Sequence, residues 1–152
     1  MYILNQLIYA FLSAIGFSII FHIPKDSVIK SGLAGALGWV VFLITKTNLS
    51  SPVAGAFWGA ITVGILGELF ARFFKKPATV FIIPGIVPLV PGAGMYYTMS
   101  AITESRFIDA ANIGSETLFV AASIASGILV SSSISRMIKR NFKIKKNIEK
   151  TA

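Results

Sequence analysis

Residues 83–92 read IPGIVPLVPG, and they place three prolines within eight positions of an uncharged stretch that runs from residue 78 to about residue 103. Uncharged segments long enough to cross a bilayer recur along most of the chain. Each proline lacks a backbone amide hydrogen and clashes with the preceding turn, so a continuous helix should break here. The stretch therefore predicts a transmembrane helix that is interrupted in its middle.

The composition around this stretch belongs to a membrane protein. Of the 152 residues 55% are hydrophobic and only 13% are charged, which is far more apolar than a soluble domain. We therefore predict an all-α integral membrane protein, one bundle of about five transmembrane helices without a separate soluble domain. Cysteine is absent, so disulfides, thiolate nucleophiles and cysteine metal sites are excluded.

Charged residues and prolines separate five predicted spans, at about residues 3–23, 28–45, 52–74, 78–103 and 117–138, with a basic tail at 141–152. The second span is short, because only 15 uncharged residues separate Lys30 from Lys46. Both lysines can extend to the interfaces, which makes a short helix tolerable. The first 24 residues carry no charge, which favours an uncleaved first span over a signal peptide. A polar loop is expected before the fifth span, and it contains Glu104, Arg106, Asp109 and Glu116.

The distribution of basic residues predicts the orientation. With five spans, twelve of the 14 lysines and arginines fall on one side, and only Lys46 and Arg106 lie opposite. The positive-inside rule makes the populated side cytoplasmic, so the N-terminus is predicted outside and the C-terminus inside. The basic tail is then an orientation signal that also meets anionic lipid, and nucleic acid is not an expected partner.

The interrupted fourth span is the main candidate for function. Unwound backbone at membrane depth has to be buried in protein or line a water-filled cavity, and many transporters bind substrates at broken helices. The alternative is a kinked packing helix, since proline is common in transmembrane helices. The hydroxyl side chains that follow the break are candidates to line a small polar site, and the alternative is that the two tyrosines among them belong to the outer aromatic belt. The predicted pathway residues are Pro84, Gly85, Pro88, Pro91, Gly92, Tyr96 and Tyr97.

Glu68 is the one acidic residue inside an apolar span, which makes it a candidate for proton coupling or for binding a substrate ammonium group. Arg72 follows four residues later, the favourable order for an ion pair along one helix face. Both residues lie near the predicted cytoplasmic end, where a charged side chain can reach water. A structural ion pair is therefore the alternative to a coupling role.

Small residues indicate where helices pack. In the third span Gly55 and Gly59 form a small-xxx-small pair that Gly64 extends, and such residues let helices approach closely in lipid. The sequence shows no histidine–carboxylate cluster, metal-ligand spacing, phosphate loop or serine motif with a base. We therefore expect no enzymatic activity, no metal and no cofactor.

The proline series at residues 84–92, followed by Tyr96 or Tyr97, closely resembles the signature of the threonine/serine exporter family, specifically its small YjjB-type subunit. The resemblance covers nearly the whole chain, including the charged turn before Pro77 and the basic end. It implies a secondary exporter of small hydroxy amino acids, or of C4 dicarboxylates, in the cytoplasmic membrane.

The resemblance also implies a partner, a larger exporter subunit that carries the other transmembrane half. An odd number of spans that starts outside can follow another five-span half, as in inverted-repeat transporters. Self-association into a homo-oligomer is the other way to complete a transporter. A different class stays open, a membrane-embedded structural or assembly subunit that stabilises the larger partner without touching substrate.

Overall fold

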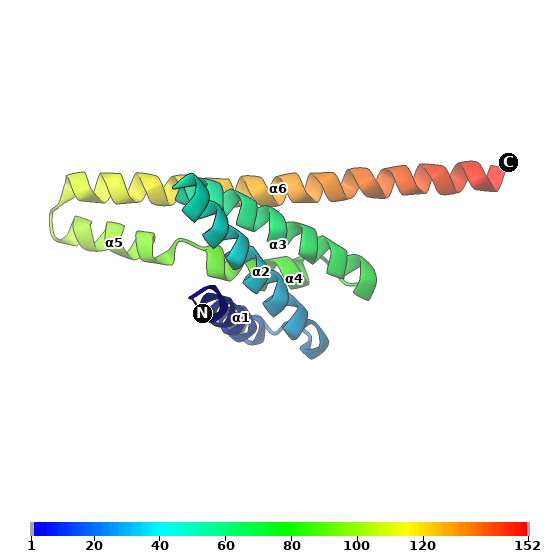
Figure 1. The fold of residues 1–152 in the computed structure, drawn as a ribbon, viewed down its shortest axis with the longest axis horizontal. Coiled ribbons are helices and arrows are strands. Elements are labelled where there is room, and N and C mark those ends of the chain that lie inside the picture. The colour runs from blue at the N-terminus through cyan, green and yellow to red at the C-terminus, as the bar shows by residue number, and fades with distance from the viewer. Residues whose placement is uncertain (1, 152) are drawn as a thin grey trace.

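The computed structural model describes the backbone of residues 2–151 and the side chains of residues 2–137. Every regular element in that part of the chain is helical, which confirms the predicted all-α class (Figure 1). The elements in chain order are α1 (Tyr2–Ile20), α2 (Lys25–Leu49), α3 (Pro52–Phe74), α4 (Thr79–Ile86), the 3₁₀ turn η1 (Val87–Leu89), α5 (Gly92–Thr103) and α6 (Phe107–Thr151).

The number of membrane-spanning helices agrees with the prediction. Among the described residues, α1, α2, α3 and residues 107–137 of α6 are each long and apolar enough to cross a bilayer. The pair formed by α4 with η1 and α5 passes the same test together, with a bend of 51° at the break. Counting that bent pair as one span gives five, and it places the interruption where the prolines predict it.

Local capping explains where α3 begins and ends. The Ser51 side chain accepts a hydrogen bond from the Ala54 amide at 3.2 Å, and Pro52 occupies the first turn, where its missing amide costs nothing. At the other end, Lys75 adopts a left-handed conformation with φ 54°. The helix therefore stops at the two lysines and Pro77 that follow it.

The single histidine also ends a helix. His22 is left-handed at φ 54°, its amide donates to the Ile19 carbonyl, and the Ile23 amide donates to the Ser18 carbonyl, both at 3.0 Å. These two bonds form a Schellman motif, in which a residue just past the helix takes the left-handed conformation. The structure thus gives His22 a role in terminating α1.

Helix α2 is longer than the uncharged stretch within it. Its 25 residues correspond to about 37 Å, against about 30 Å for the hydrocarbon core. The Lys30 ammonium lies 3.9 Å from the centre of the Phe74 ring, a cation–π contact that keeps the charge beside an aromatic face. The lysine is therefore accommodated inside the helix and does not end it.

The helices approach one another at glycines. A Cβ atom added at Gly59 in α3 would lie 2.9 Å from the Gly38 carbonyl oxygen in α2, and one at Gly38 would lie 3.1 Å from the Gly59 oxygen. A Cβ at Gly127 in α6 would lie 2.7 Å from the Phe57 carbonyl oxygen in α3. At these crossings backbone meets backbone, so the bundle depends on residues without side chains.

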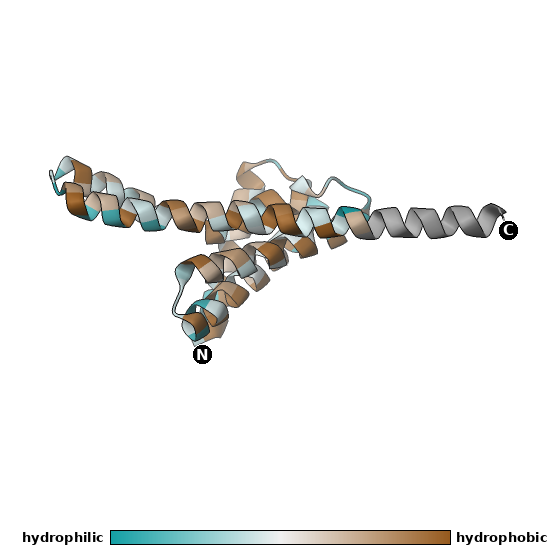
Figure 2. Ribbon diagram, turned by 90° about the horizontal axis from the view of Figure 1, so that it is seen from above, coloured by the Kyte–Doolittle hydropathy of each residue, from teal (hydrophilic) through white to brown (hydrophobic). Residues whose placement is uncertain are grey.

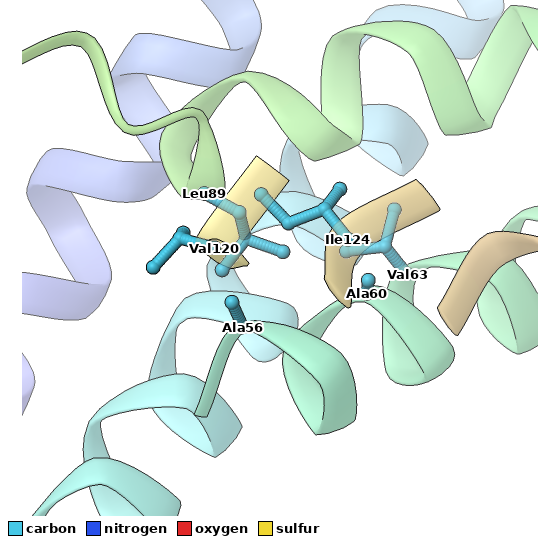
Figure 3. Packing of buried hydrophobic residues seen from close by; sticks show 6 residues of the cluster. All are labelled: Ala56, Ala60, Val63, Leu89, Val120 and Ile124. Atoms are coloured by element: carbon cyan, nitrogen blue, oxygen red, sulfur yellow. The ribbon is translucent and has the colours of Figure 1, made fainter. Parts of the chain in front are cut away.

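The centre of the bundle combines α3, α6 and the 3₁₀ turn (Figure 3). Leu89 of the turn is 3% exposed, and it lies against small residues of α3 and branched residues of α6. The broken segment therefore belongs to the core. The buried cluster consists of Ala56, Ala60, Val63, Leu89, Val120 and Ile124.

Helix α6 begins ten residues before the expected start of the fifth span. Residues 104–106 alone form the turn after α5, so Asp109 and Glu116 lie on the helix and not in the expected loop. Figure 2 shows hydrophilic and hydrophobic colours side by side at this tip. The early start gives α5 and the first turns of α6 the form of an extended hairpin (Figure 1).

Two glycine–threonine contacts hold this hairpin together. A Cβ atom at Gly94 in α5 would collide with the Thr117 side chain of α6, and one at Gly114 in α6 would lie 3.1 Å from the Thr98 methyl group of α5. In each helix a glycine thus lies against a threonine of the other helix. This reciprocal fit lets α5 lie close along α6.

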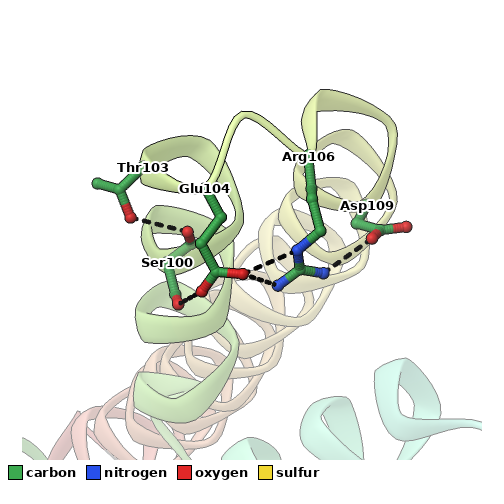
Figure 4. Close-up of polar contacts among 5 residues, drawn as sticks. All are labelled: Ser100, Thr103, Glu104, Arg106 and Asp109. Carbon is green, nitrogen blue, oxygen red and sulfur yellow. Dashed lines mark hydrogen bonds and ion pairs between the residues drawn. The ribbon is translucent and has the colours of Figure 1, made fainter.

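Polar contacts close the tip of the hairpin (Figure 4). The Ser100 hydroxyl donates to Glu104 at 2.9 Å, and the Arg106 guanidinium contacts Glu104 at 2.9 Å and Asp109 at 2.8 Å. The hydrogen bond from Ser100, and then Arg106, lower the pKa of Glu104 below its ordinary value of 4.5. Asp109, and then Glu104, raise the pKa of Arg106. The turn is thus held by the ionised form of Glu104.

We expect this turn to loosen in acid. Folding lowers the pKa of Glu104 below that of the unfolded chain. The stability that its contacts contribute is therefore present above the pKa of the unfolded state, and it is lost as the pH falls through the pKa of the folded state. The effect should be small, since exposed ion pairs are weak. Amide hydrogen exchange of residues 104–107, measured below pH 5 against Glu104→Gln at each pH, checks this. Equal pH dependence in the two proteins would contradict it.

Candidate functional site

The break in the fourth span is closed by local hydrogen bonds. The Val87 amide donates to the Pro84 carbonyl and the Val90 amide to the Val87 carbonyl, the latter at 3.1 Å, so 3₁₀ bonds replace those that the prolines cannot make. Pro91 has φ −78° and ψ 56°, and around it the Gly92 amide reaches the Val90 carbonyl at 2.8 Å, an inverse γ-turn. The backbone is therefore redirected while these carbonyls stay paired.

The first half of the broken segment is buried. Pro84 lies inside α4 and is fully buried, and the Gly85 carbonyl oxygen lies 3.0 Å from where a Cβ of Gly35 in α2 would stand. A Cβ at Gly85 would in turn lie 3.1 Å from Val63 of α3. Pro84 and Gly85 thus let α4 fit between α2 and α3.

The second half of the segment faces outward. Nothing lies within 4 Å of a Cβ built at Gly92. Tyr96 is 69% exposed and Tyr97 58%, and their rings meet edge to face at 5.5 Å between centroids. The predicted pathway residues are therefore divided between the interior and the surface of α5, and they do not surround one site in this chain.

Glu68 and Arg72 meet at a third residue, Ser135 of α6. The Ser135 hydroxyl donates to Glu68 at 3.1 Å, and the Arg72 guanidinium donates to both the hydroxyl and the carbonyl of Ser135 at 2.6 Å. Among the ion pairs between described side chains there is none between Glu68 and Arg72. The sequence places the two on one helix face, and the structure adds the serine that both contact.

A pocket opens beside this cluster. Its volume is about 780 Å³, and Lys75, Lys76 and Arg136 surround it together with Glu68 and Arg72. A second, smaller cavity of about 220 Å³ shares Glu68, Arg72 and Ser135, and its other walls are mainly apolar side chains of α3 and α6. The cluster thus stands between a polar pocket and an apolar one. The end of the bundle that carries this pocket is called the basic end below.

Other charged and hydroxyl side chains tie the helices together at the basic end. Lys76 forms an ion pair with Asp26 and donates to the Ser27 hydroxyl at 3.1 Å, so the turn after α3 is held against the start of α2. The hydroxyls of Ser18 and Ser31 lie 3.1 Å apart and join α1 to α2. These contacts bring the turns after α1 and α3 together.

Sequence reasoning missed the serines of this region. Ser18, Ser27 and Ser31 are fully buried, and Ser135 bridges two charged groups. The spacing of Ser27 and Ser31 on one helix face and the serine-rich stretch 131–135 were the available signals. Within the described residues no three side chains of metal-binding type come together.

Comparison with known proteins identifies the family. The family described as Threonine/Serine exporter, ThrE, matches residues 6–134. A protein of Corynebacterium glutamicum named threonine/serine exporter is 31% identical over 129 residues, which cover 84% of this chain and 26% of that protein. The chain thus spans about a quarter of the length of this relative. No solved structure matches the chain.

The matched region includes most of α1, all of α2 to α5 and most of the spanning part of α6. Both the family and the apolar helices identify a multi-pass membrane protein with a role in transport. The chain belongs to the threonine/serine exporter family.

Proposed function

We propose that the chain is one subunit of a secondary transporter that exports threonine, serine or related small carboxylates across the cytoplasmic membrane. The observation that carries the proposal is the family match over residues 6–134 together with the length of the relative, of which this chain spans only 26%. In this proposal a larger subunit carries the other transmembrane half of the transporter.

The arrangement of charge supports an orientation with the N-terminus outside and the C-terminus inside. Lys76 contacts Asp26, and Arg72 contacts Ser135, so the turn after α1, the end of α3 and the spanning end of α6 meet at the basic end. The positive-inside rule makes this end cytoplasmic.

The exposed half of the broken segment supports a role at a subunit boundary. Tyr96 and Tyr97 point away from the helices of this chain, and in a two-subunit transporter the same face can line a pathway shared with the partner. The buried half, with Pro84 and Gly85, holds that face in place. A second function, a structural subunit without substrate contact, is favoured by the local hydrogen bonds that close the break.

Efflux of labelled threonine, serine and succinate, a C4 dicarboxylate, from loaded cells tests the proposal. Cells express this chain alone, the larger partner alone, or both. Export only with both subunits is the expected result. No export of threonine, serine or a C4 dicarboxylate in any combination would refute the transporter assignment.

Two variants separate the transporter from the structural subunit. Pro88→Ala restores an amide donor and removes a helix penalty of about 3 kcal/mol, so it favours a straighter segment. We expect it to lower the export rate about tenfold, equivalent to about 1.4 kcal/mol in the barrier, with assembly intact. Tyr96→Phe removes one exposed hydroxyl and should change export without changing assembly. A smaller amount of assembled complex with an unchanged export rate per complex would favour the structural role.

A further inference from the structure

We propose that Glu68, Arg72 and Ser135 form a binding site for the zwitterionic head of a small α-amino acid, at the mouth of the pocket at the basic end. This inference rests on the proposed function and names the site through which substrate is taken up from the cytoplasm.

The cluster contains two groups of opposite charge, Glu68 and Arg72, that form no ion pair with each other. One Glu68 oxygen accepts from the Ser135 hydroxyl, and one terminal nitrogen of Arg72 donates to Ser135. Among the described side chains, the second Glu68 oxygen and the other Arg72 nitrogens have no hydrogen-bond partner. Both charged groups therefore keep hydrogen-bonding capacity toward a ligand in the pocket.

An α-amino acid matches this arrangement. Its ammonium and carboxylate groups are attached to the same carbon atom, and here an acceptor and a donor lie within reach of one serine hydroxyl. A guanidinium presents several donors to a carboxylate and a glutamate accepts from an ammonium group, which are the strong, charge-assisted kind of hydrogen bond. Each end of the ligand thus meets its complement.

The smaller cavity provides space for the side chain of the ligand. It measures about 220 Å³ and extends between α3 and α6 from the same three residues. Ile65, Leu69 and Ile134 give it apolar walls, and Ser131 is also on its lining. A short side chain that carries a methyl group and a hydroxyl fits this mixture better than a long or charged one.

One carboxylate at the pocket distinguishes an amino acid from a purely anionic ligand. Lys76 is paired with Asp26, so three cations, Arg72, Lys75 and Arg136, face a pocket that also contains the Glu68 carboxylate. That carboxylate repels a lipid phosphate or a dicarboxylate placed beside it, whereas it attracts an ammonium group. Glu68 is thus the residue that selects for a zwitterion.

Equilibrium binding measures this directly. The chain together with its larger partner, and the chain alone, are placed in nanodiscs of neutral and of anionic lipid and are titrated with labelled threonine and labelled succinate. We expect Arg72→Gln to weaken the binding of both ligands about tenfold, the loss expected for one hydrogen bond to a charged group. Glu68→Gln should weaken threonine binding about tenfold and leave succinate binding equal or stronger.

The control is Lys46→Gln, which removes a cation outside this pocket and should bind threonine like the unaltered chain. Weaker binding of threonine without weaker binding of succinate in Glu68→Gln is a change that a purely structural link between α3 and α6 would not produce. Absence of threonine binding, or wild-type binding in both cluster variants, would overturn the proposal. So would an effect of Arg72→Gln confined to the retention of anionic lipid.

The binding result is independent of the export experiment. Threonine binding with the expected changes, in a system that exports nothing, would support the site and refute the proposed function. Export of threonine with unchanged binding in the Glu68 and Arg72 variants would refute the site and leave the proposed function standing.

Discussion

Phe81→Ala should strongly destabilise the chain. Phe81 in α4 is completely buried, and its ring meets Phe70 edge to face at 5.8 Å and Phe74 at 6.4 Å between centroids. Truncation leaves a cavity among these rings. The unfolded helices of a membrane protein stay in lipid, so the loss of packing, and not transfer from water, determines the cost. We expect the free energy of unfolding to fall by about 2–4 kcal/mol.

Unfolding by a denaturing detergent in mixed micelles, followed by tryptophan fluorescence, measures this loss. Trp39 is a suitable reporter, since it stacks on Phe42 at 4.9 Å and donates to Gln6 at 3.1 Å, and so senses the contact of α1 with α2. The matched control is Phe73→Ala. Phe73 is 73% exposed, so its truncation should change the unfolding free energy by less than about 0.5 kcal/mol. Equal effects of the two truncations would mean that α4 is not packed as described.

Gly59→Ala should also destabilise the chain, by somewhat less than Phe81→Ala. The added methyl group would lie 2.9 Å from the Gly38 carbonyl oxygen, 3.0 Å from Leu89 and 3.3 Å from the Cβ of Phe42. The carbonyl is backbone of a packed helix and cannot turn away, so α2 and α3 have to separate at their crossing. Overpacking of this kind costs about 1–3 kcal/mol.

The control for Gly59→Ala is Gly16→Ala, in α1, where nothing lies within 4 Å of the added methyl group. Alanine favours helix over glycine by about 1 kcal/mol, so this variant should be unchanged or slightly more stable. The same unfolding assay compares the two variants. A stable Gly59→Ala protein would show that the close crossing of α2 and α3 is not required for folding.

Gly59→Ala should in addition disturb the break, because Gly59 lies against Leu89 of the 3₁₀ turn. Export should then fall with stability in this variant, whereas Pro88→Ala changes export at constant assembly. Comparing the two separates the effect of packing around the break from the effect of the break itself.

Much of the fold is predictable from the sequence because the causes are local. Pro84, Pro88 and Pro91 remove amide donors wherever the segment lies, so they mark the position of the break. Ser51 with Pro52 begins a helix by contacts within one turn. The apolar composition and the grouping of lysine and arginine likewise predict a membrane bundle without knowledge of how its helices pack.

The candidate site is predictable only in part. Glu68 and Arg72 stand out in the sequence as charges near the end of a span, but Ser135, which joins them, lies 63 positions beyond Arg72. The residues of the break form one group in the sequence, whereas the structure buries Pro84 and exposes Tyr96. Nothing in the local sequence separates those two environments.

The membrane character, the helices and the place of the break therefore follow from the amino-acid sequence alone. Tertiary packing determines which faces are buried, the extended hairpin of α5 with α6, and the meeting of Glu68 and Arg72 at Ser135. The physical reason is that in lipid both faces of a helix are apolar, so hydropathy does not mark the packed side. The packed side is determined by the shape of the helix surface. Glycines such as Gly38 and Gly59 have no side chain, so distant segments can come into contact there.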